Sequence, residues 1–271
     1  MLVVTTPTGQ IGRHVLARLA DAGEPVRAIA RDPGRIDPDR RGQVEVVAGS
    51  HGDAATLARA LEGAEGVFWC IPPDYAAPDA REYYLGYARV LAEALPGSSV
   101  RRVVFVSSGG RGRSARAGVV GISHEVEGLL EATGVGVRSL RCGTFMENML
   151  RLVGPIRHAG VFGNPVAGDV PVPLVAVADI GAVAADLSYD EMAATMARVL
   201  GRPVRYRQVP AAEFVAQGVE HGMSPSMAQG LADMFREVNA GLYAADPRTP
   251  ESTTPTTFEA WCRAHLVPAM G

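Results

Sequence analysis

The sequence predicts an α/β fold in which a doubly wound, mainly parallel sheet is followed by a smaller, mainly helical lobe. Three observations support this prediction. The chain begins with a short apolar strand that leads into a glycine-containing turn and a helix start, strand and helix patterns then alternate to about residue 150, and helical patterns dominate the rest. A chain of 271 residues is long enough for one nucleotide domain with an appended lobe.

The first strand, residues 2–5, leads into the turn TPTGQIG at residues 6–12. Gly9 would let the backbone approach a pyrophosphate, Gly12 would let the following helix pack on the strand, and the helix N-terminus would present N–H groups to an anion. The usual fingerprint has a third, earlier glycine, and Thr6 stands in that slot, so an ordinary βα turn is the alternative. The expected Rossmann-type dinucleotide site is formed by Thr6, Thr8, Gly9, Gln10, Ile11 and Gly12.

The next two elements complete a βαβ unit. The helix has apolar residues at Ile11, Val15 and Leu19 and a stop at Gly23, and the second strand, residues 26–30, ends at Arg31. NAD-binding domains carry an acidic residue there for the ribose 2′-hydroxyl, whereas a guanidinium suits a 2′-phosphate. We therefore expect NADP(H). A solvated Arg31 is the alternative, and the neighbouring Asp32 keeps NAD open.

The alternation continues through a third strand at 44–47, a helix at 54–61 capped by Asp53, a fourth strand at 66–71, a helix at 80–95, a fifth strand at 103–106, a helix at 123–132 and a sixth strand at 137–141. The carboxyl ends of these strands should face the cofactor. Four strand-end residues therefore join the predicted cofactor site, namely Ile71, Pro72, Ser107 and Ser108.

The later chain is predicted to be helical. Ser188 and Glu191 form a capping box for a helix that ends at Gly201, and Thr256 and Glu259 repeat the pattern. A short strand at 204–206 and helices at 214–222 and 226–243 lie between them. We expect residues 1–150, with 179–186 returning to them, to form the dinucleotide domain, and residues 151–178 and 187–271 to form a substrate or lid lobe.

The chain has 26 basic residues other than histidine, and all of them are arginines. Without lysine there can be no tyrosine–lysine catalytic pair, no lysine Schiff base and no phosphate-binding Walker lysine. The net charge of −3 gives no electrostatic case for nucleic acid. The local cluster Arg111, Arg113 and Arg116 is interpreted as a solvated or anion-facing loop.

Other classes are excluded by what the sequence lacks. The three cysteines form no CxxC pair and the histidines form no HExxH motif, so no metal site is expected. Isolated cysteines are typical of a reducing compartment, and we expect the cytoplasm. We see no leader pattern and no apolar run long enough for a membrane span. A monomer or homodimer acting on a small, apolar substrate is the expectation.

Several segments together carry a family resemblance. They are the TPTGQIG turn, Arg31 in the context ARDP, the serine pair after the fifth strand, the HxxE of His124 and Glu127, LRCGTFMEN at 140–148 and VADIGAVAAD at 177–186. In order and spacing they resemble the NmrA-like atypical short-chain dehydrogenase/reductases. The resemblance implies an NADP(H)-binding protein. Relatives include quinone, dye and phenylpropanoid-ether reductases, and also redox sensors that bind the dinucleotide without evident turnover.

The chain departs from that family at several positions. The aspartate often found after the third strand is Ser50, and the proline usual after the sixth-strand arginine is Cys142. Many catalytic relatives place a histidine or lysine four residues before the helix glutamate, where this chain has Ser123. His124 lies one residue further, about 100° around the helix, and could face either the pocket or solvent. Relatives also insert a strand before the segment at 187–191, so Asp186-Leu187 is either a deletion or a join across absent residues.

The resulting functional hypothesis is an NADP(H)-dependent oxidoreductase that reduces an apolar aromatic, quinone-like or polyketide-like carbonyl or enone. The cofactor carries the hydride chemistry, so the protein must chiefly bind, orient and exclude water. His124, Ser123 and Asn148 are the candidate catalytic residues. A non-catalytic NADP(H) sensor is the main alternative, and non-redox tailoring chemistry is a third. Five apolar residues could either line a substrate pocket or belong to the hydrophobic core, namely Phe145, Met146, Met149, Met223 and Met227.

Overall fold

The structure is a computed structural model that describes residues 1–114, 116–180, 186–243 and 255–271. The chain forms two compact units. Unit 1 comprises residues 1–74, 79–107 and 122–141, and unit 2 comprises residues 75–78, 108–121 and 142–271.

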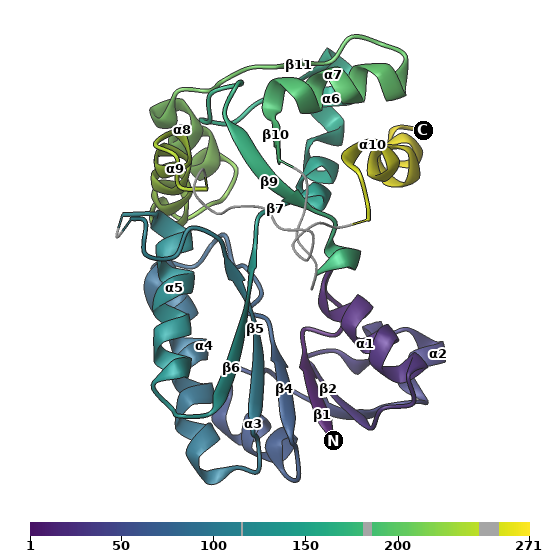
Figure 1. The fold of residues 1–271 in the computed structure, drawn as a ribbon, viewed down its shortest axis with the longest axis vertical. Coiled ribbons are helices and arrows are strands. Elements are labelled where there is room, and N and C mark those ends of the chain that lie inside the picture. Colours follow the sequence, from purple (N-terminus) through teal and green to yellow (C-terminus); the bar gives the residue numbers. More distant parts are fainter. Residues whose placement is uncertain (115, 181–185, 244–254) are drawn as a thin grey trace. The chain divides into compact units, whose positions relative to one another are not determined.

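Unit 1 is built on a six-stranded sheet with the order β3-β2-β1-β4-β5-β6 (Figure 1). Its strands are β1 (Leu2–Thr5), β2 (Val26–Ala30), β3 (Glu45–Ala48), β4 (Gly66–Trp69), β5 (Arg102–Ser108) and β6 (Gly136–Cys142). The pairs from β3 across to β5 are parallel, with Val3 opposite both Arg27 and Val67. The order reverses between β1 and β4, which is the switch point of a doubly wound sheet. The predicted Rossmann-type fold is confirmed.

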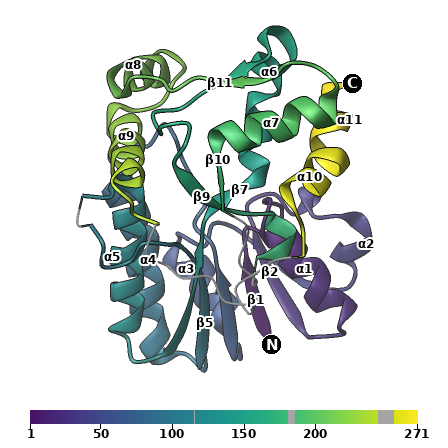
Figure 2. The same ribbon diagram turned by 45° about the horizontal axis from the view of Figure 1, so that its top comes forward.

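Helices cover both faces of this sheet (Figures 1 and 2). One face carries α1 (Gly12–Asp21) and α2 (Pro38–Arg41), and the other carries α3 (Ala54–Leu61), α4 (Ala80–Ala94) and α5 (Gly118–Glu131). The predicted cap of α3 is confirmed, since the Asp53 carboxylate accepts a hydrogen bond from the Thr56 N–H at 2.8 Å. Gly23, in the left-handed region at φ 72°, ends α1 as expected. The core on the second face includes the fully buried Trp69, Leu91 and Leu130.

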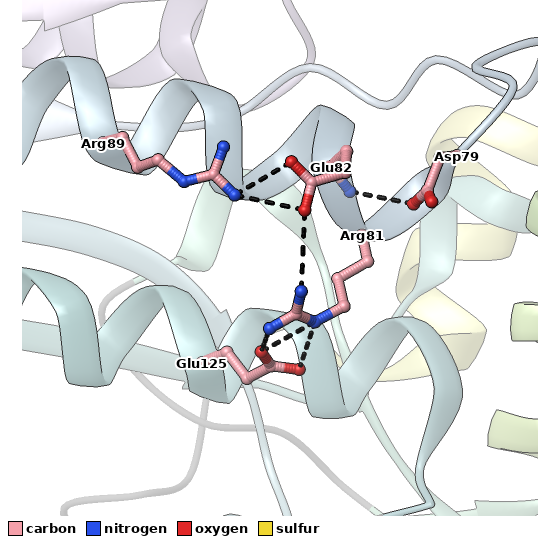
Figure 3. A network of polar contacts seen from close by, with 5 residues as sticks. All are labelled: Asp79, Arg81, Glu82, Arg89 and Glu125. Carbon is pink, nitrogen blue, oxygen red and sulfur yellow. Dashed lines mark hydrogen bonds and ion pairs between the residues drawn. The ribbon is translucent and has the colours of Figure 1, made fainter.

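A surface network joins α4 to α5 (Figure 3). Arg81 meets Glu125 of α5 at 2.6 Å and Glu82 of its own helix at 3.5 Å, and Arg89 meets Glu82 at 2.9 Å. Asp79 caps α4 by accepting from the Glu82 N–H at 2.9 Å. These ion-paired side chains are about half exposed, so water screens them, and their main effect is to fix which faces of the two helices meet.

Unit 2 has two small sheets and several helices. The three-stranded sheet has the order β10-β9-β7, and the two-stranded sheet pairs β11 with β8. The strands are β7 (Thr144–Phe145), β8 (Val161–Phe162), β9 (Pro171–Val175), β10 (Asp186–Ser188) and β11 (Arg205–Tyr206). The helices are α6 (Val153–Ala159), α7 (Tyr189–Leu200), α8 (Ala211–Glu220), α9 (Pro225–Asn239), α10 (Phe258–Trp261) and α11 (Val267–Met270). Helices α8 and α9 pack on each other.

The two predicted capping boxes of this unit have different outcomes. At α7 both bonds are present, Glu191 N–H to Ser188 Oγ at 3.2 Å and Ser188 N–H to Glu191 Oε2 at 2.8 Å. The box at Thr256 was wrong. Thr257 caps α10 by accepting from Ala260 N–H at 3.2 Å, a register that buries Phe258 and Trp261, which are stacked on each other.

Two further differences concern the later chain. The helix expected over 226–243 ends at Asn239, as α9. The question of residues missing before Leu187 falls partly on residues 181–185, which lie outside the described chain, whereas Asp186 and Leu187 pair with β9. No helix among the described residues is long and apolar enough to cross a lipid bilayer.

Candidate functional site

A buried hydroxyl links the two strand ends at the switch point of the unit 1 sheet. Thr5, the last residue of β1, donates to the Phe68 carbonyl of β4 at 3.1 Å, and its oxygen accepts from the Cys70 N–H at 2.9 Å. The ends of β1 and β4 are therefore tied together at the edge where doubly wound folds bind nucleotides. Ile71 and Pro72, two predicted cofactor residues, follow β4 directly. The sequence analysis missed Thr5, because a threonine at a strand end carries no local signal of a partner in another strand.

The turn after β1 has the geometry that a glycine-rich turn requires. Thr6, which stands in the slot of the missing first glycine, has φ 49°, a left-handed conformation that costs roughly 1–2 kcal/mol for a residue other than glycine. Gly9 closes the turn by donating from its N–H to the Thr6 carbonyl at 2.9 Å. A Cβ on Gly12 would lie 2.1 Å from that carbonyl oxygen, and one on Gly9 would lie 3.2 Å from it. The turn thus needs glycine at position 12 and is tight at position 9.

The start of α1 fits an anionic group. The Ile11 N-cap provides no side-chain cap, and the first turn contains no acidic residue. The Thr6 hydroxyl is buried without a hydrogen-bond partner in the protein. An uncompensated helix N-terminus beside an unsatisfied hydroxyl suits the pyrophosphate of a dinucleotide, which would supply both a negative charge and hydrogen-bond acceptors. Thr8 and Gln10 lie in the same turn.

The residues after β2 bear on which dinucleotide fits. Arg31 follows Ala30, the last residue of the strand, and is exposed. Asp32, the residue that kept NAD open, uses its Oδ1 to accept from the Gly34 N–H at 2.9 Å and so caps the short 3₁₀ turn Pro33–Arg35. The carboxylate therefore has a local structural role, while the guanidinium next to it is on the surface.

A buried histidine lies close to Arg31. The His51 ring is edge-on to Trp69 with ring centroids 4.8 Å apart, and its centroid is 4.7 Å from that of Tyr87. Burial and, to a smaller extent, the Arg31 charge together lower the pKa of His51 from 6.5 to about 4, against a hydrogen bond with the Cys70 backbone that raises it. His51 is therefore neutral at neutral pH. The one sequence signal was its flanking glycine Gly52, where a Cβ would lie 2.8 Å from the Tyr87 ring.

The remaining predicted residues are distributed over both units. Ser107 and Ser108 end β5, and the Ser107 hydroxyl is buried without a partner in the protein. Ser123 and His124 lie in α5 and are partly exposed. Asn148 lies in unit 2, in the 3₁₀ helix η3 (Met146–Leu152). The catalytic role of Ser123, His124 and Asn148 stays a prediction.

The helix glutamate of the family resemblance is committed to an ion pair. Glu127 is fully buried and accepts from Arg141 Nε at 3.2 Å and Nη2 at 2.9 Å. Because a two-pronged guanidinium contact fixes both groups, the pair holds α5 on β6 just before the chain enters unit 2. Sequence analysis did not predict Arg141 as the partner.

The segment around Asn148 is anchored by its neighbour Glu147. The buried Glu147 carboxylate accepts from Trp261 Nε1 at 3.0 Å and from the Val177 N–H at 3.1 Å. Of the five apolar residues that could have lined a pocket, Met146, Met149 and Met227 are at most 4% exposed, so they belong to the core of unit 2.

The chain is similar to several known proteins. Residues 7–140 match the model of an NAD(P)H-binding family. A curated relative, the (4-alkanoyl-5-oxo-2,5-dihydrofuran-3-yl)methyl phosphate reductase of Streptomyces griseus, is 35% identical over 229 residues, which cover 77% of each chain. The NAD(P)H azoreductase of Xenophilus azovorans is 25% identical, with 98% of each chain covered. The structure of an NADPH-dependent quinone oxidoreductase from Escherichia coli, in complex with NADPH, superposes with a TM-score of 0.80 at 22% identity, covering 98% of this chain and 100% of that one.

The fold and these matches define the class of the protein. The chain belongs to the NmrA-like branch of the atypical short-chain dehydrogenase/reductases, as the resemblance predicted, and is an NAD(P)H-dependent oxidoreductase of that type. The prediction that the protein uses a nicotinamide dinucleotide cofactor is confirmed.

Proposed function

We propose that the protein uses NADP(H) to reduce a conjugated carbonyl system, either the carbon–carbon double bond of an enone or a quinone-like ring, which becomes a hydroquinone. The observation that carries this proposal is the 35% identity to a reductase whose name describes a dihydrofuranone with an alkanoyl substituent and a methyl phosphate. That compound is an enone in the sense of the sequence-based hypothesis, because its ring double bond is conjugated to the carbonyl groups.

The proposed cofactor site follows the carboxyl edge of the unit 1 sheet. The turn from Thr6 to Gly12 receives the pyrophosphate, and the exposed Arg31 binds the 2′-phosphate that distinguishes NADPH from NADH. The engagement of Asp32 in its own turn supports this choice. Ile71, Pro72, Ser107 and Ser108 complete the site.

The proposed chemistry requires little acid–base catalysis from the protein. Bound NADPH supplies a hydride. When a hydride adds to an alkene that bears two carbonyl groups, the resulting negative charge is shared by both oxygens, so a hydrogen bond is enough to stabilise it until a proton from water completes the reduction. Ser108, Ser123, His124 or Asn148 would donate that bond. A chain without lysine can therefore catalyse this reduction, although it cannot use a tyrosine–lysine pair.

The organisation expected from the sequence remains part of the proposal. Residues 1–150 with 179–186 would bind the dinucleotide, and residues 151–178 with 187–271 would cover the substrate. We expect a cytoplasmic monomer or homodimer whose substrate is a small molecule with a large apolar part.

The experiment is an acceptor panel in which NADPH oxidation is followed by absorbance. It contains an acyl-substituted dihydrofuranone, a benzoquinone, and, as a matched control, the same dihydrofuranone with its ring double bond already saturated. We expect turnover with the unsaturated acceptors only, and in the dihydrofuranone product deuterium from labelled NADPH should appear on a former alkene carbon. Reduction of the saturated control at its ketone, or no reduction of any unsaturated acceptor, would contradict the proposed substrate class.

Variants separate substrate contacts from cofactor contacts. We expect His124→Ala or Asn148→Ala to lower kcat without changing NADPH affinity, because these groups would touch the substrate. A parallel loss of NADPH affinity would remove them from that role.

A further inference from the structure

We propose that Arg151 binds an anionic group on the substrate, of the chemistry of a phosphate monoester. The inference rests on the proposed function, because the anion would belong to the molecule that is reduced. The four residues that carry it, Tyr75, Asn148, Arg151 and Ser224, all belong to unit 2.

The backbone of η3 places Arg151 on the same side as Asn148. Met146–Leu152 is a 3₁₀ helix, in which residues three apart lie directly above each other. With a rise of about 2 Å per residue, the two positions are separated by roughly 6 Å along the helix axis. A substrate whose carbonyl oxygen meets Asn148 would thus have a charged substituent a few bonds away within reach of Arg151.

The guanidinium of Arg151 is held in place before any ligand arrives. Its central carbon lies 5.1 Å from the centroid of the Tyr75 ring, a cation–π arrangement, and it also donates a hydrogen bond to the Tyr75 hydroxyl. Tyr75 is itself fixed, because its carbonyl accepts from the N–H of Ser224, the N-cap of α9, at 2.9 Å. A side chain that is already ordered loses less conformational entropy when it binds a ligand.

The charge of Arg151 is not compensated within the described chain. Some exposed arginines of unit 2 meet carboxylates, as Arg207 does with Glu213 at 3.2 Å and Arg236 with Asp233 at 2.8 Å. Others, such as Arg157, donate to backbone carbonyls. Among the residues that the structure describes, no carboxylate lies within ion-pair distance of Arg151, whose partner is a neutral phenol. The rest of its planar fork of N–H donors suits two oxygens of a phosphate.

This arrangement agrees with one detail of the 35% identical reductase, whose name places a methyl phosphate on the ring. Under the proposal, the apolar part of the substrate lies against the lobe and its phosphate lies at Arg151. Specificity would then come from a charged contact three residues from the group that binds the carbonyl.

The test compares an acyl-dihydrofuranone methyl phosphate with the corresponding alcohol. For the full-length protein we expect Arg151→Met to raise KM for the phosphate roughly ten- to a hundredfold, with kcat and the kinetics of the alcohol unchanged. Tyr75→Leu should raise the same KM by a smaller factor, because the guanidinium is kept but no longer positioned. Arg236→Met, which removes an exposed arginine of α9, is the matched control and should change neither the KM for the phosphate nor the kinetics of the alcohol.

A binding measurement keeps the inference independent of turnover. In protein saturated with the dinucleotide, which occupies the turn at the start of α1 and Arg31, inorganic phosphate should compete with the phosphorylated acceptor and raise the Tm of the wild type. Arg151→Met should abolish both effects, while Arg236→Met retains them. Equal kinetic losses for phosphate and alcohol, or phosphate protection that survives Arg151→Met, would overturn the anion site. If the wild type reduces the alcohol as efficiently as the phosphate, the site is refuted and the proposed function stands. If it reduces neither, the proposed function fails and the Tm comparison alone decides on Arg151.

Discussion

The buried His51 makes the stability of unit 1 depend on pH. Its pKa is about 4 in the folded chain and 6.5 ordinarily, because burial between Trp69 and Tyr87 disfavours the charged ring. The unfolded chain therefore takes up a proton on His51 before the folded chain does. The free energy of unfolding should fall as the pH falls from about 6.5 to about 4 and change no further below that, as far as this group is concerned.

The size of the effect follows from the two pKa values. Their difference corresponds to about 3 kcal/mol of stability that is present above pH 6.5 and lost as the pH falls to about 4. For a domain of ordinary stability this is a large fraction of the total. His51→Phe, which keeps an aromatic ring between Trp69 and Tyr87 but cannot be protonated, should remove this part of the pH dependence.

The assay is urea unfolding at a series of pH values, monitored by tryptophan fluorescence. The chain has two tryptophans, so a Trp261→Phe background leaves Trp69, which contacts His51, as the reporter of unit 1. Between about pH 4 and pH 6.5, the free energy of unfolding of the wild-type reporter should rise with pH, and that of its His51→Phe derivative should lack this rise. His158→Phe, at an exposed site of unit 2, is the control and should follow the reporter. If His51→Phe retains the full slope, the buried neutral histidine is not the cause and the reasoning fails.

Three further outcomes follow from the site. Arg31→Ala should weaken NADPH binding roughly ten- to a hundredfold in titrations and leave NADH almost unchanged, and equal losses would reject its contact with the 2′-phosphate. Gly12→Ala should weaken the binding of both NADPH and NADH, since its Cβ would lie 2.1 Å from the Thr6 carbonyl oxygen. Gly128→Ala, whose Cβ would meet no atom within 4 Å, should bind both cofactors normally. Glu147→Leu leaves two buried N–H donors unsatisfied and should cost about 2–6 kcal/mol in urea unfolding followed by Trp261 fluorescence, and a loss near zero would show that water replaces the carboxylate.

Much of the fold could be predicted because its signals are local. The α3 helix was predicted with its observed bounds, since Asp53 provides a cap and the apolar residues that follow recur with the period of a helix. The Ser188–Glu191 box was predicted correctly for the same reason, because both of its bonds join residues three apart. The Thr256 box failed, since two adjacent threonines offer equivalent caps and only the burial of Phe258 and Trp261 selects Thr257.

The candidate site divides along the same line. The glycine positions of the turn followed from the sequence, because backbone conformation limits which residues a tight βα turn accepts, and Thr6 takes the left-handed conformation that the missing glycine would have taken. The sequence pattern also placed Arg31 at the end of a strand. It did not show that Asp32 is engaged in a local cap, which is what favours the arginine as the cofactor contact.

The sequence by itself determined the fold class, the start of the nucleotide turn, the caps of α3 and α7 and the exclusion of lysine chemistry, because each depends on residues close together in the chain or on composition. The tertiary structure decided that Thr5 joins β1 to β4, that His51 is buried against Trp69, and that Arg151 lies over Tyr75. The last pair is 76 residues apart in sequence. Such contacts form only when several elements have packed, since the partner of a polar side chain depends on which distant segment the fold brings within hydrogen-bond distance.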